Sequence, residues 1–499
     1  MTEIRTPLSR IVVVGGGIVA LSAALALRRA LPRCAIAVLD QPVAANAFAD
    51  TAMTALPFAH EFLDRIGITE DDILREAGGS HRLVTRYFGW GAPDSSGAPS
   101  HGVLAYGEER DPNLRSAFAR EWGGGARSTT KSGTPGISSL AQALADAGRY
   151  AVPPHDVETP LAQVQSALRW EPGALHALLV RRAQAQRIAH VQGTIEGAAP
   201  DAEGGIAALA LDGERRIEAE LFVDCTGPVA LLARALPASG ECDWSGHLPL
   251  RGLAVAPRGE PIIALEDRVT LLPEGWLGEN AGRGGLETML GLPESVPQDR
   301  IAPALGCEPA AILPHAPGRL AQAWSGNVVA LGDAFARVEP LGGLPFDLAQ
   351  RAIKLLVELL PGVPVIPQER AEFNRRAALM ADGVLDALSY HYAAPSAGSS
   401  FPAARPTDAA AEVIDQLGRR GRLPFRDEAP LLGQETIALL VALGHRHGIA
   451  PQDLTASEAD ALAARSRFEQ EVRGLVVSAP PYAEWLQREL SRDPDLAFG

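Results

Sequence analysis

The feature that most constrains this chain is a strand–turn–helix–strand pattern in its first forty residues. Residues 10–14 form a continuous run rich in β-branched side chains, which is typical of a parallel strand buried on both faces. Residues 15–20, Gly-Gly-Gly-Ile-Val-Ala, match the pattern G-x-G-x-x-A, and the alanine- and leucine-rich residues 21–30 predict a helix. A second apolar strand, 35–39, ends at Asp40. This order predicts a dinucleotide-binding unit.

Each part of this unit has a mechanical purpose. Gly15 allows the tight turn from strand to helix, Gly16 follows it in the same turn, and Gly17 lets the backbone approach a pyrophosphate closely. Ala20 is small enough for the helix to pack against the strand. Asp40 lies twenty residues beyond Ala20, where an acid binds the ribose hydroxyls. The free N–H groups at the start of the helix would receive the phosphates.

A second arrangement of elements, which simple NAD dehydrogenases lack, favours FAD. The short apolar strand in 326–331 ends at Gly332-Asp333, and Gly342-Gly343 lead into a long helical pattern, 344–360. In flavoprotein hydroxylases a strand ending in Gly-Asp places the acid on the ribityl hydroxyls, and the next helix directs its N-terminus at the flavin. Asp333 alone has a simpler alternative role as a helix N-cap. The Gly342-Gly343 pair would let the backbone approach the flavin edge.

Between these two elements, residues 219–225 predict another strand of the same sheet. It ends in Asp224-Cys225-Thr226-Gly227. We expect Gly227 to lie near the dinucleotide, and Asp224 is explained as a cap of the turn.

Composition excludes several other classes of protein. The formal net charge of −15 argues against nucleic-acid binding by a basic face. The four cysteines are far apart and form no CxxC motif, so we expect no zinc or other metal site, no disulfide framework and a reducing, cytoplasmic location. The apolar run 11–27 has the length of a signal peptide, but three glycines interrupt it and two arginines close it. We therefore expect no membrane association.

With these motifs in place, the chain resembles the flavin-dependent tryptophan halogenases, within the FAD-dependent monooxygenase superfamily. The resemblance covers most of the chain in short motifs. Besides residues 15–20 they are Phe62-Leu63-Asp64-Arg65-Ile66-Gly67-Ile68, Trp170-Glu171-Pro172-Gly173-Ala174-Leu175, Phe222-Val223-Asp224-Cys225-Thr226-Gly227, Val338-Glu339-Pro340-Leu341, Phe373-Asn374-Arg375-Arg376, His391-Tyr392 and Pro480-Pro481-Tyr482.

The departures from this family concern its halogenating residues. The family's lysine lies in a segment of the type Phe-Lys-Leu-Gly, and Arg82 stands there in this chain. The family's Glu after Glu-Pro-Leu is replaced by Gly342. Of the signature Gly-Trp-x-Trp-x-Ile-Pro only Gly275-Trp276 remains, and 52–55 takes the place of the Gly-Glu-Ala-Thr flavin strap. An arginine is not equivalent to the lysine, because it keeps its proton.

The resemblance implies an α/β fold. It consists of a Rossmann-like FAD-binding domain of the flavoprotein hydroxylase type, an interleaved β-rich substrate domain and a helical C-terminal region. We predict a discontinuous FAD domain over 1–75, 160–235 and 315–362. Residues 76–159 and 236–314 would cover the substrate, and 363–499 would form the helical region.

The implied activity is oxidation of an aromatic, indole- or phenol-like substrate, free or bound to a carrier, by a monooxygenase that uses reduced FAD and O₂. A separate flavin reductase would supply the reduced FAD. The candidate catalytic residues are Arg82, His81, whose side-chain type titrates near neutral pH, and Glu339. His81 has a simpler alternative as part of an exposed polar turn, and Trp90 and Trp276 either stack on substrate or pack in the core. An atypical halogenase and a catalytically inactive flavin-binding partner remain alternatives.

Overall fold

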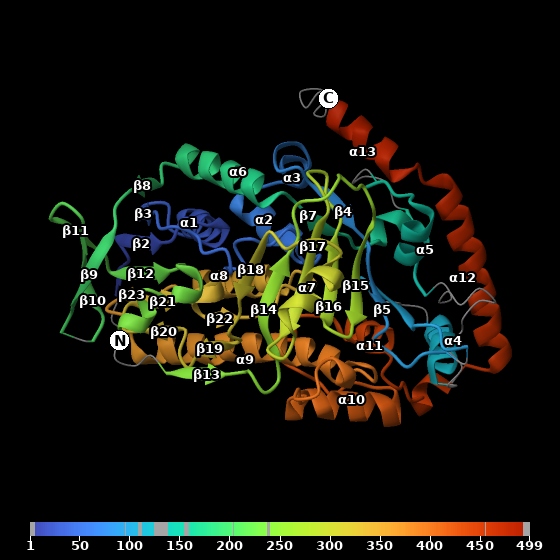
Figure 1. Ribbon diagram of the computed structural model, residues 1–499. Coiled ribbons are helices and arrows are strands. Elements are labelled where there is room, and N and C mark those ends of the chain that lie inside the picture. The colour runs from blue at the N-terminus through green and yellow to red at the C-terminus, as the bar shows by residue number, and fades with distance from the viewer. Residues whose placement is uncertain are drawn as a thin grey trace. The chain divides into compact units, whose positions relative to one another are not determined.

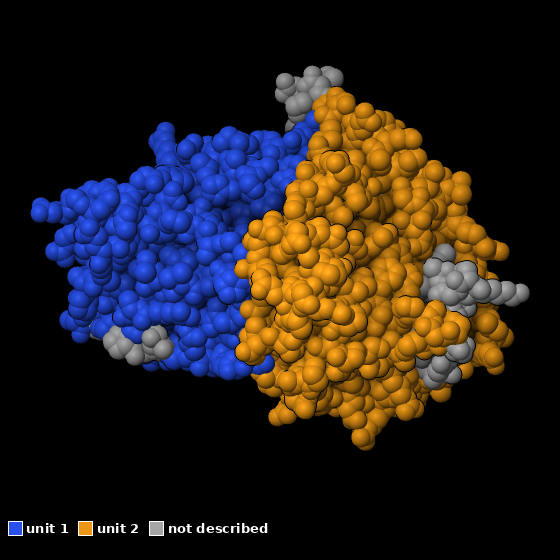
Figure 2. Space-filling view, in the orientation of Figure 1, with its two compact units in different colours: residues 1–78, 170–245, 313–385 blue, residues 79–169, 246–312, 386–499 orange. Residues whose placement is uncertain are grey.

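Three separate stretches of chain make up each of two units in the computed structural model. Unit 1 comprises residues 1–78, 170–245 and 313–385, and unit 2 comprises residues 79–169, 246–312 and 386–499 (Figure 2). The structure describes residues 5–94, 96–107, 112–123, 138–153, 159–202, 204–236, 240–454 and 456–492.

Unit 1 is built on a six-stranded sheet with the strand order β20-β21-β12-β2-β3-β8 (Figure 1). Only β20 is antiparallel to its neighbour. The strand β2 lies between β12 and β3, and its last four residues are all buried, as is typical of an inner parallel strand. The bounds are β2 (Arg10–Val14), β3 (Ala35–Leu39), β8 (Ala189–Val191), β12 (Leu221–Asp224), β20 (Trp324–Ser325) and β21 (Val328–Ala330). The strands predicted over 10–14 and 35–39, and those near 219–225 and 326–331, are confirmed.

The helices of unit 1 include one that starts at the carboxyl end of the central strand β2. Helix α1 (Ile18–Ala30) follows β2 directly, is buried over most of its length and packs against α6 (Pro172–Ala185) and α8 (Leu344–Glu358). Helix α3 (Glu70–Glu76) begins at a capping box formed by Thr69 and Asp72. The remaining elements of unit 1 are β1 (Thr6–Pro7), α2 (Ala59–Ile66), β9 (Ile195–Pro200), β10 (Ile206–Leu211), β11 (Arg215–Glu218), η2 (Gly227–Val229), η3 (Ala233–Ala235), β13 (Glu241–Asp243), β19 (Gly318–Leu320), η4 (Gly332–Ala334), β22 (Ala336–Arg337) and β23 (Gly362–Val363).

Unit 2 is organised around a seven-stranded sheet with the order β18-β14-β17-β16-β15-β5-β6. Strands β15 and β5 are parallel, and the unit boundary falls within β18. A short antiparallel pair, β4 and β7, places His81 opposite Leu168. The bounds are β4 (Ser80–Arg82), β5 (Val84–Phe88), β6 (His101–Ala105), β7 (Ala167–Arg169), β14 (Leu250–Val255), β15 (Glu266–Leu272), β16 (Gly275–Asn280), β17 (Glu287–Pro293) and β18 (Ala311–Pro314).

The helices of unit 2 come mostly from the C-terminal part of the chain. The long helix α12 (Glu458–Ser478) packs against α4 (Pro112–Gly123) and α5 (Leu140–Ala147), and α11 (Gly433–Ala442) packs against β6. The others are η1 (Pro160–Gln163), α7 (Gln298–Leu305), η5 (Ala397–Ser399), α10 (Asp408–Arg420), η6 (Pro451–Leu454) and α13 (Tyr482–Ser491). Among the described residues, no helix combines the length and apolar character needed to cross a bilayer.

The predicted α/β fold class, with a Rossmann-like sheet and a β-rich second part, is confirmed. The units differ from the predicted boundaries at several places, and residues 236–245 belong to unit 1. Residues 160–169 belong to unit 2. The predicted helical region, 363–499, is divided, because its first part up to residue 385 belongs to unit 1 and the rest to unit 2. Helix α9 (Pro367–Tyr392) runs through that boundary without a break.

Candidate functional site

The carboxyl ends of β2, β12 and β21 meet at one edge of the parallel sheet in unit 1. The turn after β2 passes very close to the end of β12 there. Gly15 has φ +142°, and a Cβ at this residue would lie 2.5 Å from the carbonyl oxygen of Cys225. Its N–H donates to the carbonyl of Leu39 at 3.0 Å. Only glycine fits this turn, as the sequence predicts.

The next two glycines make room for two carboxylates. A Cβ at Gly16 would lie 2.1 Å from Oδ1 of Asp40, and a Cβ at Gly17 would lie 2.1 Å from Oδ1 of Asp50. Gly17 is the N-cap of α1, and Ala20 in the first turn is completely buried. We had predicted that Gly17 lets the backbone approach a pyrophosphate. In the structure the side chain of Asp50 lies next to Gly17.

Asp50 is a site residue that the sequence analysis missed. Its side chain is buried, and Oδ1 accepts a hydrogen bond from the N–H of Val19 at 2.8 Å. Burial raises the pKa of Asp50 to about 6, against the N–H groups of Val19 and Ile18, which lower it. The available signal was a single acid after the apolar residues 47–49, just before residues 52–55, which take the place of the family's flavin strap.

Asp40 follows β3 and is partly exposed. Its N–H donates to Val191 at 2.9 Å, and its Oδ2 accepts from Nε2 of Gln192 at 2.8 Å. An accessible carboxylate at the end of this strand has the position that ribose recognition requires.

Asp224 is a structural cap, as we had expected. Its Oδ1 accepts from the Thr226 hydroxyl at 2.7 Å, and its Oδ2 accepts from the N–H groups of Leu232 and Ala233 at 2.8 and 2.9 Å. Burial raises the pKa of this carboxyl. Gly227 follows in the same turn with φ +66°, and a Cβ there would lie 3.1 Å from Cβ of Ala47.

Asp333 lies in the short helix η4 after β21 and is 3% exposed. Its Oδ2 accepts from the N–H of Ala49 at 2.8 Å, while its Oδ1 has no hydrogen-bond partner among the described residues. Burial raises the pKa of Asp333 to about 8, and the charge of Asp50 adds to that effect. Gly332, before it, has φ +58° and packs against Val19.

The Gly342-Gly343 pair forms the turn before α8. Gly343 is the N-cap of α8 with φ +84°, and a Cβ there would lie 2.9 Å from Cα of Ala55. Gly342 has φ +63° with no atom near its Cβ direction among the described residues. Glu339, on the segment before this pair, is completely buried. The close approach at Gly343 is to the loop around Ala55.

These residues fit a flavin dinucleotide. The N-terminus of α1 provides N–H groups for phosphates, and Asp40 provides an accessible acid for a ribose. The Asp333 oxygen that lacks a partner matches a ligand hydroxyl donor. All the predicted cofactor residues lie in unit 1, as does Glu339, whereas His81 and Arg82 lie in unit 2.

In unit 2, Arg82 belongs to a buried ionic cluster with Asp267 and Arg169. The Nε of Arg82 lies 3.4 Å from Oδ2 of Asp267, and its side chain is 1% exposed. It also donates to the Thr85 hydroxyl at 3.1 Å, and its guanidinium carbon lies 5.4 Å from the centre of the Tyr106 ring. Arg169 donates twice to Oδ1 of Asp267, at 2.8 and 3.0 Å.

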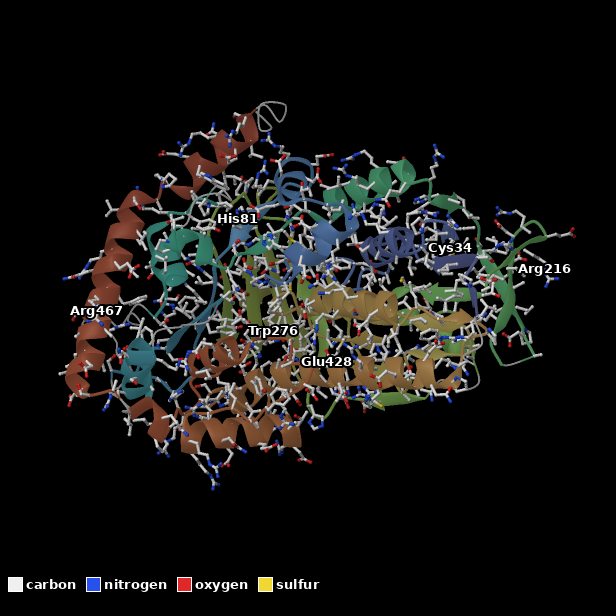
Figure 3. The ribbon with its side chains drawn as sticks, turned by 180° about the vertical axis from the view of Figure 1, so that it is seen from behind. Cys34, His81, Arg216, Trp276, Glu428 and Arg467 are labelled. Atoms are coloured by element: carbon white, nitrogen blue, oxygen red, sulfur yellow. The ribbon has the colours of Figure 1, made fainter. Side chains whose placement is uncertain are left out.

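His81 is completely buried, so its interpretation as part of an exposed turn is wrong. His81 lies in β4, and Figure 3 labels its side chain. Its N–H donates to the Tyr482 hydroxyl at 2.7 Å. Its Nδ1 lies 3.0 Å from the same hydroxyl. The rings of Tyr150, Tyr482 and Trp485 surround its imidazole with centroid distances of 5.6, 5.8 and 5.6 Å. The catalytic roles of His81, Arg82 and Glu339 stay predictions.

Both candidate tryptophans of unit 2 are completely buried. The Nε1 of Trp90 donates to the carbonyl of Val269 at 3.1 Å, and the Nε1 of Trp276 donates to the Tyr392 hydroxyl at 3.1 Å. Trp276 is labelled among the side chains of unit 2 in Figure 3. These contacts favour core packing over substrate stacking.

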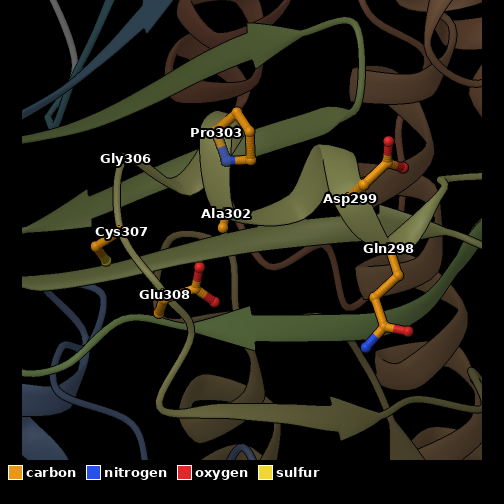
Figure 4. Close-up of a pocket in the computed structure, with 7 residues that line it drawn as sticks. All are labelled: Gln298, Asp299, Ala302, Pro303, Gly306, Cys307 and Glu308. Atoms are coloured by element: carbon orange, nitrogen blue, oxygen red, sulfur yellow. The ribbon is translucent and has the colours of Figure 1, made fainter.

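An open pocket of about 710 Å³ lies along α7 and contains none of the predicted site residues (Figure 4). Its lining residues are Gln298, Asp299, Ala302, Pro303, Gly306, Cys307 and Glu308. It has no aromatic side chain and two acids, so it does not suit an aromatic substrate. Among the described residues, no three His, Cys, Asp or Glu side chains lie together as a metal site would require.

Comparison with known proteins agrees with this architecture. A family model described as "Tryptophan halogenase" matches residues 10–279 and 299–447. Tryptophan 7-halogenase RebH of Lentzea aerocolonigenes is 27% identical over 463 residues, which cover 85% of each chain. Tryptophan 7-halogenase KtzQ of Kutzneria sp. (strain 744) is 26% identical over 427 residues, which cover 78% of this chain and 77% of the relative.

Two solved structures share the fold. BrvH, a flavin-dependent halogenase from Brevundimonas sp. BAL3, has a TM-score of 0.84 at 22% identity, with coverage of 97% of this chain and 99% of the other. Xcc4156, a flavin-dependent halogenase from Xanthomonas campestris, has a TM-score of 0.83 at 22% identity, with coverage of 97% and 98%.

The fold and the dinucleotide site in unit 1 define an FAD-dependent oxidoreductase. The family model matches most of the chain, and the chain belongs to the tryptophan halogenase family. FAD is therefore its cofactor, as the sequence predicts.

Proposed function

We propose that this protein is an FAD-dependent monooxygenase that inserts one oxygen atom of O₂ into an aromatic, indole- or phenol-like ring. The other oxygen atom leaves as water. Reduced FAD, when bound, supplies the two electrons of this reaction, and a separate flavin reductase regenerates it. The family membership supports flavin-dependent oxidation of an aromatic substrate. We choose oxygenation over halogenation because of the surroundings of Arg82 in unit 2.

The observation that carries this choice is the buried ion pair of Arg82 with Asp267. When the sequence is compared with the family's Phe-Lys-Leu-Gly segment, Arg82 takes the position of the halogenating lysine. A guanidinium does not lose its proton in proteins, so it does not provide a neutral amine. The Asp267 carboxylate and the Thr85 hydroxyl also hold Arg82 in place. This arrangement suits a structural cation better than a reacting group.

The scarcity of lysine supports the same choice. The whole sequence has two lysines, Lys131 and Lys354. Lys354 lies on α8 in unit 1, where its amine is 3.4 Å from a carboxylate oxygen of Glu61, and both side chains are exposed. Lys131 lies outside the described residues. A lysine-dependent halogenation would have to use one of these two side chains.

The experiment is product analysis with purified protein, FAD, a flavin reductase, NADH and ¹⁸O₂. Indoles and phenols, free and carrier-bound, would be tested with and without chloride or bromide. We expect a product that carries ¹⁸O and forms equally well without halide. A halogenated product that disappears when halide is omitted would overturn the proposal in favour of an atypical halogenase.

A halogenated product would then be traced to its residue with Arg82→Ala, Lys131→Ala and Lys354→Ala. Loss of that product in Arg82→Ala alone would assign the reaction to Arg82. The inactive-partner alternative predicts a third result, namely saturable FAD binding with no oxidised product from any substrate in the panel.

We also propose the cellular compartment of the reaction and the form of its substrate. All four cysteines are free, which supports a reducing, cytoplasmic compartment. The substrate is a small aromatic molecule, either free or attached to a carrier.

A further inference from the structure

Asp50 stabilises the start of α1 from a distant part of the chain. The local N-cap of α1, Gly17, provides no side-chain acceptor. Asp50 lies between β3 and α2, and its Oδ1 accepts the N–H of Val19 at 2.8 Å. Helices usually obtain such an acceptor from their own N-cap residue. Here the turn that faces the phosphates of a dinucleotide depends on a carboxylate from another loop.

The same loop also contacts the second half of the site. The N–H of Ala49, next to Asp50, donates to Oδ2 of Asp333 at 2.8 Å. A Cβ at Gly332 would lie 3.2 Å from a methyl carbon of Val19 and 3.7 Å from Cβ of Ala49. The first turn of α1, the loop and η4 are therefore packed tightly together. Asp50 thus contacts Val19 directly, and its chain neighbour Ala49 contacts Asp333.

The titratable groups around Asp50 are mostly acidic. Asp333 on η4 and the Cys225 thiol at the end of β12 both interact with its charge, and Asp224 acts on the same thiol. The ring of His315 packs on Phe48 at 5.5 Å, two residues before Asp50. Burial is the largest cause that raises the pKa of Asp50 to about 6 and the pKa of Asp333 to about 8. A bound diphosphate adds negative charge beside these carboxyls and favours their neutral forms.

We propose that Asp50 is a positioning residue of the dinucleotide site. It holds the first turn of α1 next to η4, and it takes up a proton when a dinucleotide diphosphate binds. The proton comes from solvent and forms a neutral carboxyl group on Asp50. Its carbonyl oxygen still accepts the Val19 N–H, and its new hydroxyl is a donor toward a phosphate oxygen. The inference rests on the proposed function for the identity of the ligand, FAD.

The test is the pH profile of FAD affinity, followed by flavin fluorescence with the full-length protein. ADP-ribose serves as a second ligand, because it has the same esterified diphosphate without the flavin and its phosphates do not titrate between about pH 6 and about pH 8. Uptake of one proton makes affinity fall by up to about tenfold per pH unit above the pKa of the free carboxyl. We expect the binding of FAD and of ADP-ribose by the wild type to weaken at least about threefold between about pH 6 and about pH 8.

Variants separate Asp50 from the other acids. Asp50→Asn keeps an acceptor for Val19, so we expect FAD binding with a pH profile that is flat between about pH 6 and about pH 7, below the pKa of Asp333. Asp50→Ala weakens binding at every pH. Asp333→Asn removes the second titrating carboxyl and retains the slope caused by Asp50. Asp212→Asn, an exposed acid of the same unit, is the control and keeps the wild-type profile.

Calorimetry of FAD binding by the wild type, in two buffers of different ionisation enthalpy, measures the proton directly and needs no variant. A flat wild-type profile, no proton uptake, or an unchanged slope in Asp50→Asn overturns the inference and leaves the FAD site intact. Failure to bind FAD at any pH overturns the proposed function together with the inference.

Discussion

Arg82 and Asp267 form an ion pair inside unit 2, with Nε and Oδ2 separated by 3.4 Å and with side chains that are 1% and 2% exposed. The same carboxylate also binds Arg169, which donates its other N–H groups to the carbonyls of His81, Ala264 and Glu266. One acid thus neutralises part of the charge of two buried cations. The pairing explains how an arginine is accommodated where the family resemblance places a lysine.

Replacement of Asp267 by Asn leaves two buried guanidinium groups without their carboxylate. Removing one partner of a buried ion pair typically destabilises a protein by about 3–5 kcal/mol. We expect a loss of that order in the free energy of unfolding, measured by urea denaturation. The control is Asp212→Asn, whose pair with Arg215 is about half exposed and contributes on the order of 0.5 kcal/mol. Equal effects of both substitutions would show that Asp267 is not a structural counter-ion.

Tyr482 connects α13 to β4 through its hydroxyl group. Tyr482→Phe keeps the ring contacts with His81 and Trp485 but removes the acceptor of the buried His81 N–H. An unsatisfied buried donor costs about 1–3 kcal/mol. We expect that loss in unfolding experiments and faster hydrogen exchange of the His81 amide. Phe425→Ala, at a side chain that is 89% exposed in the same unit, provides the control.

If the Tyr482→Phe variant showed wild-type stability and wild-type exchange at His81, a water molecule would have to replace the hydroxyl. The hydrogen bond from the His81 N–H to Tyr482 would then not stabilise the protein.

Local patterns in the sequence predict the parts of the site that depend on neighbours along the chain. The β-branched run of β2 and the glycines after it determine a strand and a turn whatever the rest of the chain does. Asp50 and Asp267 could not be predicted in this way. Asp50 meets Val19 and Asp267 meets Arg82 only through tertiary packing. His81 was misjudged for the same reason, because the aromatic residues that bury it come from distant segments.

The raised pKa of Asp333 predicts how the stability of the FAD-free protein depends on pH. Folding raises this pKa from its ordinary value near 4 to about 8. Between these values the folded state holds a proton that the unfolded state has lost, so stability falls as pH rises. Asp333→Asn does not titrate and keeps an acceptor for Ala49, so we expect a weaker decline in that variant.

Urea denaturation without FAD at about pH 4.5, 6 and 8 measures this effect. A shift of about four pKa units, at about 1.4 kcal/mol each, corresponds to on the order of 5 kcal/mol near pH 8. We therefore expect Asp333→Asn to be more stable than the wild type by several kcal/mol near pH 8 and to match it within about 1 kcal/mol near pH 4.5. Asp64→Asn changes an exposed acid on α2 and should follow the wild-type curve. A wild type that is more stable than Asp333→Asn at pH 8 would contradict the assignment of a buried, largely neutral carboxyl.

Gly15 and Gly17 lie two residues apart in one turn, yet they are glycines for different reasons. Gly17 has φ −91°, which any residue adopts, and the obstacle to a side chain is the Asp50 carboxylate at 2.1 Å. Gly15 has φ +142°, and its obstacle is the backbone carbonyl of Cys225 at 2.5 Å. We expect Gly15→Ala and Gly17→Ala each to weaken FAD binding, and each to destabilise unit 1 by on the order of 1–3 kcal/mol.

Removal of the Asp50 side chain distinguishes the two glycines. Asp50→Ala creates the space that Cβ of Gly17→Ala needs, so the double variant should be more stable than the sum of the single effects predicts, by at least about 1 kcal/mol. No such coupling is expected between Gly15→Ala and Asp50→Ala, because the Cys225 carbonyl does not move with Asp50. Urea denaturation of the complete cycle measures both couplings. Additive effects for Gly17 and Asp50 would mean that the carboxylate yields to a methyl group, and that Gly17 is required by the ligand rather than by Asp50.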